Sequence, residues 1–235
     1  PKVMLDAAQY FEQSGMVDKA VMLYQKAGRV SLAIDLCFRS QLFDVLSDLA
    51  DELSNESMDS SVRIETPADA QMLERCGDFF VQHEKFERAV HMYTKARQYV
   101  KALELCATKN VQLTDELAES LTPPKPDDNS SVEYKKRRVA ILKKIAKLAA
   151  QQGNFKTASK KYVQSGDKMK AMRVLIKSGD TERIIFFANV SRQRELYILA
   201  ANYLQNLDWQ KDSDTLKQII SLYTKAKAWQ NLSNF

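Results

Sequence analysis

The chain has 235 residues, of which 45% are hydrophobic and 28% are charged, a composition that supplies a buried core and is ordinary for a globular protein. No stretch approaches the roughly 18 consecutive apolar residues that a membrane span requires, and no signal-peptide pattern opens the chain. The net charge of +5 is a modest excess, which by itself indicates no nucleic-acid partner.

In chain order, the first element is a predicted helix pair at residues 6–28, "DAAQYFEQSGMVDKAVMLYQKAG", whose pattern returns at intervals of 69 residues. One step carries Tyr24 to Tyr93, a second step reaches Tyr162, and the tetrapeptide "YTKA" at 93–96 recurs at 223–226. The chain is therefore an internal repeat. The residues expected to pack these repeats together are Ala20, Tyr24, Ala27, Gly77, Phe80, Ala89, Tyr93, Ala96, Ala158, Tyr162 and Tyr223.

Half of this interval is close to the roughly 34 residues of the tetratricopeptide (TPR) unit, a helix-turn-helix, and the second unit resembles that family at specific positions. In "ERCGDFFVQHEKFERAVHMYTKA", the Gly, the two aromatic residues and the two Ala residues of the TPR pattern are Gly77, Phe80, Tyr93, Ala89 and Ala96. The first unit has Ala8 in place of the Gly, the third has Ala149 in place of an aromatic residue, and the usual closing proline is replaced by Leu32, Lys101 and Lys170.

The segments between these units, at residues 31–53, 99–121 and 168–190, carry apolar residues at three- and four-residue spacing, which is typical of amphipathic helix pairs. No alternating strand pattern competes with them. We therefore predict an all-α fold, a right-handed α-solenoid of stacked antiparallel helix hairpins. Residues 1–235 are expected to be a single solenoid segment of a larger protein, with about three double repeats of 69 residues, a partial fourth, and polar linkers near 54–66 and 122–131.

Helix boundaries are indicated at three places. Thr66 and Pro67 supply a cap followed by a proline at the first helical position, and Ser130 with Glu133 forms the pattern of a capping box. Gly179 and Asp180 are expected to end one helix and to begin the next.

No catalytic, cofactor or metal site is predicted. The six glycines all fall at repeat turns, caps or helix contacts, which leaves none for a phosphate-binding loop. His83 and His91 lack a cysteine or carboxylate at ligand spacing, so they are expected to be ordinary polar positions. An enzyme in which Cys76 or His83 is catalytic is the weakest alternative, because no activating neighbour is visible. The three cysteines, which are odd in number and lie in apolar stripes, are expected to be reduced and buried: Cys37, Cys76 and Cys106.

Two surfaces are candidates for protein binding. The run "YKKRRVAILKKIAK" contains Lys135, Lys136, Arg137 and Arg138, and it is interpreted either as the solvated face of a helix or as a contact for an acidic partner, phosphoinositide headgroups or RNA. The solvated face is favoured, and nucleic acid is not expected because no aromatic residues are interleaved with the charges.

The second candidate surface is in "GDTERIIFFANV", where residues 184–187 are apolar in succession and sweep about 300° of a helix. One hairpin partner cannot cover all of them, so Ile185 and Phe186 require another surface. We expect the next hairpin, "RELYILAANYL", to cover them; the alternative is an exposed patch that docks a neighbouring subunit.

The C-terminal part, "KAMRVLIKSGDTERIIFFANVSRQRELYILAANYLQNLDWQKDSDTLKQIISLYTKAKAWQNLSNF", closely resembles the helical-repeat region of the one-hundred-and-forty-kilodalton subunit of intraflagellar transport complex A. The resemblance extends to "AGRVSLAIDLCF" and to "RCGDFFVQHEKFERAVHMYTKARQYVKALELC", hence to most of the chain outside the two linkers. It implies a pair of N-terminal propellers in the whole protein, followed by a long TPR-like solenoid to which this segment belongs.

By the same resemblance, the protein is expected to be a core subunit of complex A in dynein-driven retrograde transport and in ciliary membrane-protein import. The implied location is the cilium and the ciliary base on the cytoplasmic side. The implied partners are other complex A subunits and ciliary cargo adaptors. No transmembrane segment is expected, and indirect association with a membrane is compatible with the sequence. The leading hypothesis is thus a non-enzymatic scaffold without cofactors. The alternative is a vesicle-coat subunit of a membrane-trafficking complex, since coats use the same plan of propeller and solenoid.

Overall fold

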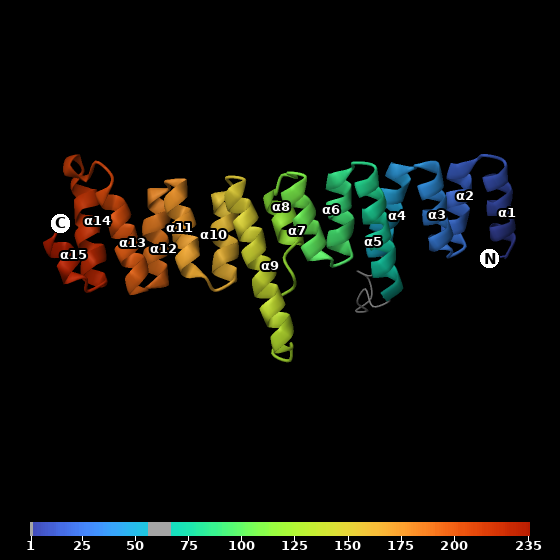
Figure 1. Cartoon of the computed structure of the whole chain (residues 1–235). Helices are drawn as coiled ribbons and strands as arrows, with labels where there is room; N and C mark the ends of the chain where they lie inside the picture. The colour runs from blue at the N-terminus through green and yellow to red at the C-terminus, as the bar shows by residue number, and fades with distance from the viewer. Residues whose placement is uncertain (1, 56–66) are drawn as a thin grey trace. The chain divides into compact units, whose positions relative to one another are not determined.

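The computed structural model describes residues 2–55 and 67–235, and in these residues every regular element is a helix. The chain divides into two compact units, Pro1–Val111 and Gln112–Phe235. Within each unit, successive helices run antiparallel and pack as hairpins (Figure 1). This arrangement confirms the predicted all-α, TPR-like solenoid. The prediction of a single solenoid segment over the whole chain stays a prediction.

The first unit contains the helix pairs of the first two repeats. Its helices are α1 (Lys2–Gln13), α2 (Val17–Lys26), α3 (Val30–Ser40), α4 (Phe43–Asn55), α5 (Pro67–Gln82), α6 (Phe86–Lys95) and α7 (Tyr99–Thr108). Helix α5 begins at the predicted proline, whereas Thr66 and most of the predicted linker at 54–66 lie outside the described residues.

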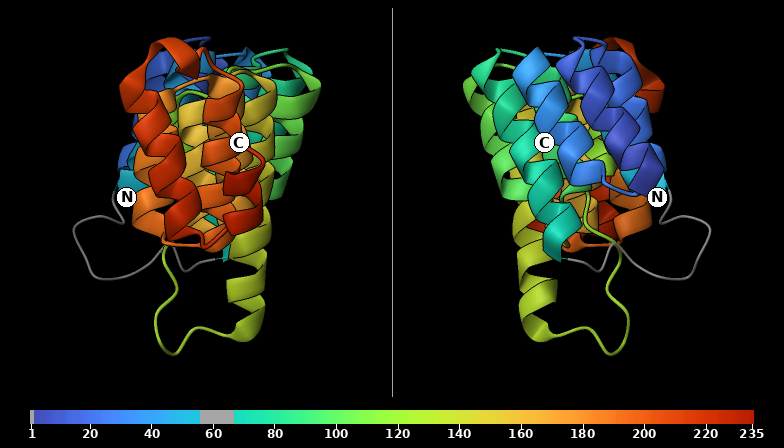
Figure 2. Two further views of the ribbon diagram at one scale, coloured as in Figure 1. Left: turned by 90° about the vertical axis from the view of Figure 1, so that its left-hand side faces the viewer. Right: turned by 90° about the vertical axis from the view of Figure 1, so that its right-hand side faces the viewer.

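The second unit contains the remaining helices, one of which is much longer than the rest. They are α8 (Asp115–Ser120), α9 (Val132–Gln151), α10 (Phe155–Gln164), α11 (Lys168–Ser178), α12 (Thr181–Ser191), α13 (Arg194–Gln205), the short 3₁₀ helix η1 (Trp209–Lys211), α14 (Ser213–Lys225) and α15 (Trp229–Ser233). The first turns of α9 extend beyond the other helices of this unit (Figure 2). Residues 122–131 form the irregular segment between α8 and α9, where a linker was predicted.

Local sequence explains several of the helix ends. Asp180 accepts a hydrogen bond from the backbone N–H of Arg183 and caps α12, and Gly179 ends α11 in the left-handed conformation, as predicted. The capping box predicted from Ser130 and Glu133 is wrong by one position. Ser131 caps α9 by accepting the N–H of Tyr134, and the Ser130 hydroxyl instead accepts the N–H of Asp127.

One turn position shows how strictly the repeat is kept. The residue that follows the last small residue of each repeat has a positive φ in all four copies, and it is glycine in two of them, Gly28 and Gly166. Arg97 and Lys227 adopt the same left-handed conformation at +58° and +51°, although a side chain disfavours it. The hairpin connection is therefore fixed by the packing of the helices rather than by the turn residue alone.

In the described parts of the chain, no helix is both long enough and apolar enough to cross a bilayer.

Candidate interaction surfaces

The residues predicted to pack the repeats lie between the helices of each hairpin. Ten of the eleven are buried, and Ala27 is half-buried. The tyrosines at the central position, Tyr24, Tyr93, Tyr162 and Tyr223, are all less than a tenth exposed. Their burial agrees with a role in packing, and their equivalence as repeat anchors stays a prediction.

The contact between α5 and α6 depends on the absence of a side chain at Gly77. A Cβ atom placed there would lie 2.6 Å from Cε1 of Tyr93, far inside van der Waals contact. The glycine of the TPR pattern thus gives space to the tyrosine of the next helix. At the same distance before Tyr24 and Tyr162, two other copies have Ala8 and Ala146, and both are fully buried.

Three of the repeat tyrosines also make a polar contact of the same kind. The Tyr24 hydroxyl donates to Glu12 at 2.8 Å, Tyr93 to Asp78 at 2.6 Å, and Tyr223 to the side-chain oxygen of Asn202 at 2.7 Å. Burial, followed by the bond to Glu12, raises the pKa of Tyr24 to about 12. Burial and the Asp78 carboxylate likewise raise the pKa of Tyr93. These hydroxyls stay protonated at physiological pH and act as hydrogen-bond donors, not as bases.

The predicted basic surface lies on the long helix α9. Lys135, Lys136 and Arg137 are exposed, and Arg137 pairs with Glu133 at 3.1 Å. Arg138 differs from its neighbours because it is half-buried and its Nε donates to the Pro123 carbonyl at 3.1 Å.

Besides the bond from Arg138, a second hydrogen bond joins the segment 122–131 to α9. The hydroxyl of Tyr134 donates to the carbonyl of Pro124 at 2.9 Å. The segment 122–131 is therefore held along the extended end of α9.

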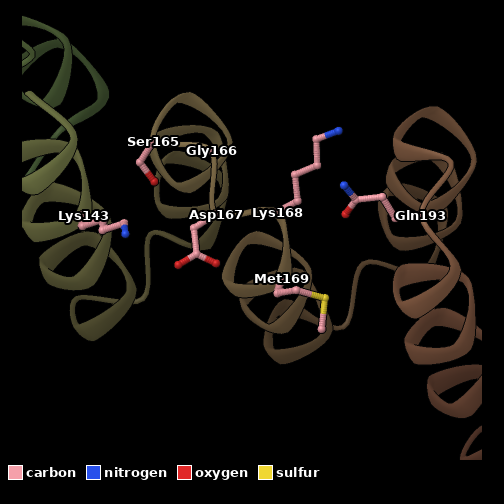
Figure 3. Close-up of a pocket in the computed structure, with 7 residues that line it drawn as sticks. All are labelled: Lys143, Ser165, Gly166, Asp167, Lys168, Met169 and Gln193. Carbon is pink, nitrogen blue, oxygen red and sulfur yellow. The ribbon is translucent and has the colours of Figure 1, made fainter. Parts of the chain in front are cut away.

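A pocket of about 320 Å³ opens beside α9, at the turn between α10 and α11 (Figure 3). Its lining residues are Lys143, Ser165, Gly166, Asp167, Lys168, Met169 and Gln193. Asp167 caps α11 by accepting the N–H of Lys170, and it also pairs with the Lys170 ammonium at 3.2 Å. Although burial opposes it, the bonds from Lys170 and the nearby Lys143 lower the pKa of Asp167. Sequence reasoning missed this pocket, because residues far apart in the chain contribute to it.

The apolar run of α12 is only partly covered by the next hairpin. Ile184 is fully buried, and Ile185 and Phe187 pack against the core formed with α13. Phe186 is 69% exposed, so the expectation that the next hairpin covers it is wrong. Val190, one helical turn later on the same face, is 62% exposed. The structure thus leaves an apolar face at this helix.

A buried lysine ties α10 to α8, and no local sequence pattern indicates it. The Lys161 side chain is fully buried, and its Nζ lies 2.8 Å from Oε2 of Glu119 and 2.6 Å from Oγ1 of Thr122. Exposed Lys160 pairs with the same carboxylate at 2.6 Å. Burial lowers the pKa of Lys161, whereas the bonds from the two lysines lower the pKa of Glu119. Together these contacts fix α8 and the start of the following segment.

The cysteines and histidines make structural contacts. All three cysteines are fully buried, and burial raises the pKa of Cys76 to about 12, so its thiol is not activated at neutral pH. The ring of His83 packs against Phe43 and Phe79 with centroids 5.1 and 4.5 Å apart. Burial, followed by the charge of Lys95, lowers the pKa of His91. Within residues 2–55 and 67–235, no group of three or more His, Cys, Asp or Glu side chains is arranged to hold a metal ion.

Two solved structures of repeat assemblies align with the chain at low similarity. One is a circular tandem repeat protein with novel repeat topology and enhanced subunit contact surfaces, with 14% identity and a TM-score of 0.17 over 94% of this chain. The chain spans 52% of that protein, about half of its length. The other is the DHF119 filament, with 15% identity and a TM-score of 0.15 over 97% of this chain and 89% of that one. Likenesses of this size carry no argument.

The model of a TPR domain family, named for the intraflagellar transport proteins 140 and 172, matches residues 1–222, which include α1 to α13 and most of α14. The match includes every repeat unit discussed above except the end of the fourth. The chain therefore belongs to the TPR domain family of the intraflagellar transport proteins 140 and 172.

Proposed function

We propose that the chain is a non-enzymatic scaffold segment that binds other subunits of intraflagellar transport complex A. The family match over residues 1–222 supports the scaffold role, because a TPR-type row of hairpins functions typically through its extended surface. The buried thiols and the packed histidine ring agree with it, since none of them has the environment of a nucleophile or a general base.

The finer parts of the proposal follow from the resemblance to the complex A subunit. The whole protein would act in retrograde transport and in import of membrane proteins, at the cilium and its base. Its partners would be complex A subunits, with cargo adaptors as further candidates.

Purification of the tagged native protein from ciliated cells tests this proposal. Complex A subunits are expected among the recovered proteins, and cross-links from this segment are expected to reach them. Recovery with a different transport assembly would overturn the assignment to complex A. Recovery with coated vesicles instead would favour the rival function, a subunit of a vesicle coat.

The exposed apolar face of α12, formed by Phe186 and Val190 beside half-buried Ile185, is proposed as one contact for a partner. The double variant Phe186→Ala/Val190→Ala should reduce the recovery of complex A subunits. Tyr10→Ala is a matched control, because Tyr10 is 66% exposed and lies in the other unit. Equal recovery with both variants would exclude the α12 face as a contact. The basic residues Lys135, Lys136, Arg137 and Arg138 are the second proposed contact.

A further inference from the structure

The positive charge of the chain is concentrated in three consecutive helices. Residues 132–178, which form α9 to α11, contain fourteen Lys and Arg residues and only two acidic residues, Glu133 and Asp167. The rest of the chain holds 21 basic and 28 acidic residues, so outside this segment the balance is negative. The modest net charge of the whole chain therefore conceals a strongly basic region.

Neither acidic residue of the region neutralises its surface. Glu133 pairs with Arg137 at 3.1 Å, and Asp167 pairs with Lys170 at 3.2 Å. Each carboxylate is thus already engaged by a neighbour on the same helix or in the same turn. Outside the region, Glu119 of α8 pairs with both Lys160 and Lys161. Three carboxylates cannot balance fourteen cations, so the region keeps a large positive excess.

Helix geometry aligns three of these lysines. At 100° and 1.5 Å per residue, Lys136, Lys143 and Lys147 fall within about 40° of one another and extend over about 16 Å of α9. All three are exposed. The result is a straight row of ammonium groups along one side of the helix.

The middle of this row meets the pocket beside α9. Lys143 is one of the lining residues, and Lys168 contributes a second ammonium group from the start of α11 (Figure 3). The amide of Gln193, from the residue that precedes α13, lies on the far side. Asp167 also lines the pocket, but its carboxylate is paired with Lys170. Two cations, an amide donor and the paired carboxylate of Asp167 therefore line an open, shallow concavity of about 320 Å³.

We propose that α9 to α11 form a docking surface for an extended, acidic segment of a partner protein. An extended strand advances about 3.3 Å per residue, so five or six residues match the lysine row, with carboxylates at every second or third position. An acidic side chain of the partner would lie over the open mouth of the pocket, within reach of Lys143 and Lys168 and above the Asp167 carboxylate that is paired with Lys170. This proposal rests on the scaffold function and adds the chemistry of one partner.

The geometry favours a peptide over two other polyanions. A bilayer is bound through exposed large apolar side chains as well as through charge, whereas α9 exposes one of them, Val132, at its first position. Single-stranded nucleic acid requires exposed aromatic rings for stacking. The aromatic residue nearest the row, Tyr134, is half-buried and hydrogen-bonded to Pro124.

Fluorescence anisotropy with a labelled peptide of alternating glutamate and alanine, about eight residues long, tests the proposal on the whole chain. The chain should bind the peptide, with an affinity that falls at least severalfold as salt rises from about 50 to about 200 mM, and the peptide with glutamine in place of glutamate should not bind. The triple variant Lys136→Gln/Lys143→Gln/Lys147→Gln should weaken binding about tenfold or more. Lys168→Gln alone should weaken it about threefold.

A matched triple variant distinguishes binding at the lysine row from a general effect of the net charge. Lys211→Gln/Lys217→Gln/Lys227→Gln removes the same charge from exposed positions outside α9 to α11 and should change the affinity less than about twofold. Circular dichroism spectra and melting temperatures of both variants should match those of the native chain, since all six side chains are exposed.

Several results would overturn the proposal: no binding of the glutamate peptide, equal losses in the two triple variants, or binding only to vesicles that contain phosphatidylserine. An unchanged affinity in Lys168→Gln would remove the pocket from the site. If peptide binding fails while complex A subunits are still recovered, the docking surface is wrong and the scaffold function stands. If the peptide binds but no complex A subunit is recovered, the docking surface stands and the assignment to complex A is wrong.

Discussion

Buried Lys161 allows a sharp test of how α8 is held against α10. Replacing Glu119 by glutamine preserves the shape of the side chain but leaves the ammonium of Lys161 without a counter-charge at 2.8 Å. Removing one partner of a fully buried ion pair costs roughly 3–5 kcal/mol. Because the Glu119 side chain is 48% exposed and water screens the pair, we expect Glu119→Gln to lower the free energy of unfolding by only about 2 kcal/mol.

Lys161→Met should have a smaller effect, within about 1 kcal/mol, because it removes the buried charge together with the need for a partner. Glu119 would keep its bond to Lys160, and the Thr122 hydroxyl would still donate to the carbonyl of Ala118 at 2.7 Å. Urea unfolding followed by circular dichroism measures both changes, and unchanged m-values are required for the comparison. Lys160→Met is the control, because it removes the exposed lysine of the same pair, and it should shift the urea midpoint little.

The change of stability with pH is a second, independent test of the buried charge on Lys161. Burial lowers the pKa of Lys161 in the folded state below its unfolded value of about 10.4, so between these two values the unfolded chain binds more protons. Native stability relative to Lys161→Met should therefore rise as pH increases through this window. A larger loss in Lys161→Met than in Glu119→Gln, or a relative stability that falls with pH, would refute the view that the ammonium is a buried charge in need of its partner.

Three further predictions concern packing and chemistry. Tyr93→Ala should cost about 3 kcal/mol in urea unfolding, because the ring fills the space over Gly77, and a loss below about 0.5 kcal/mol would contradict its role as a repeat anchor. Phe186→Ala should change stability by less than about 0.5 kcal/mol, whereas Ile184→Ala on the same helix should cost about 2–5 kcal/mol; equal losses would show that α12 is oriented differently. A thiol reagent at neutral pH should not label the native chain and should label it after unfolding in urea, and rapid labelling of the native chain would mean an activated thiol among Cys37, Cys76 and Cys106.

The fold was accessible from the sequence because its signals are periodic. The central tyrosines recur at 69-residue intervals, and apolar residues at helical spacing mark the remaining helices, so the all-α hairpin arrangement could be predicted without tertiary information. The boundary at Gly179 and Asp180 was equally accessible, since a left-handed cap and an N-cap are local features.

The details of the surfaces were less accessible because they depend on distant partners. Arg138 belongs to a basic run and has the composition of an exposed residue, but the segment before α9 folds back and supplies the Pro123 carbonyl. Lys161 sits in the pair "KK" at 160–161, and only its neighbour is exposed. Glu119, which pairs with both lysines, lies 42 residues before Lys161, and no local pattern identifies it. The exposure of Phe186 depends on the orientation of α12, and a run of four apolar residues does not define that orientation.

A contact between a lysine and an acceptor two helices earlier recurs along the even-numbered helices. In the first unit, Lys95 of α6 pairs with Asp51 of α4 at 2.5 Å, and in the second unit Lys161 of α10 pairs with Glu119 of α8. Lys225 of α14 donates to Asn189 of α12 at 2.8 Å, which repeats the contact with an uncharged partner.

In each case the later helix supplies the lysine and the helix two positions earlier supplies the acceptor. These lysines hold neighbouring hairpins in register, so their charge is used within the chain. The helices α9 and α11 stand outside this set of contacts, and their lysines along the row and at the pocket have no acidic counterpart on their own helices beyond Glu133. The odd-numbered helices of the first unit make equivalent pairs, Arg39 with Glu12 at 2.9 Å and Arg75 with Asp35 at 3.0 Å. The exposed charge of α9 and α11 therefore reflects how few carboxylates these helices carry, because the same type of contact occurs in both sets of helices.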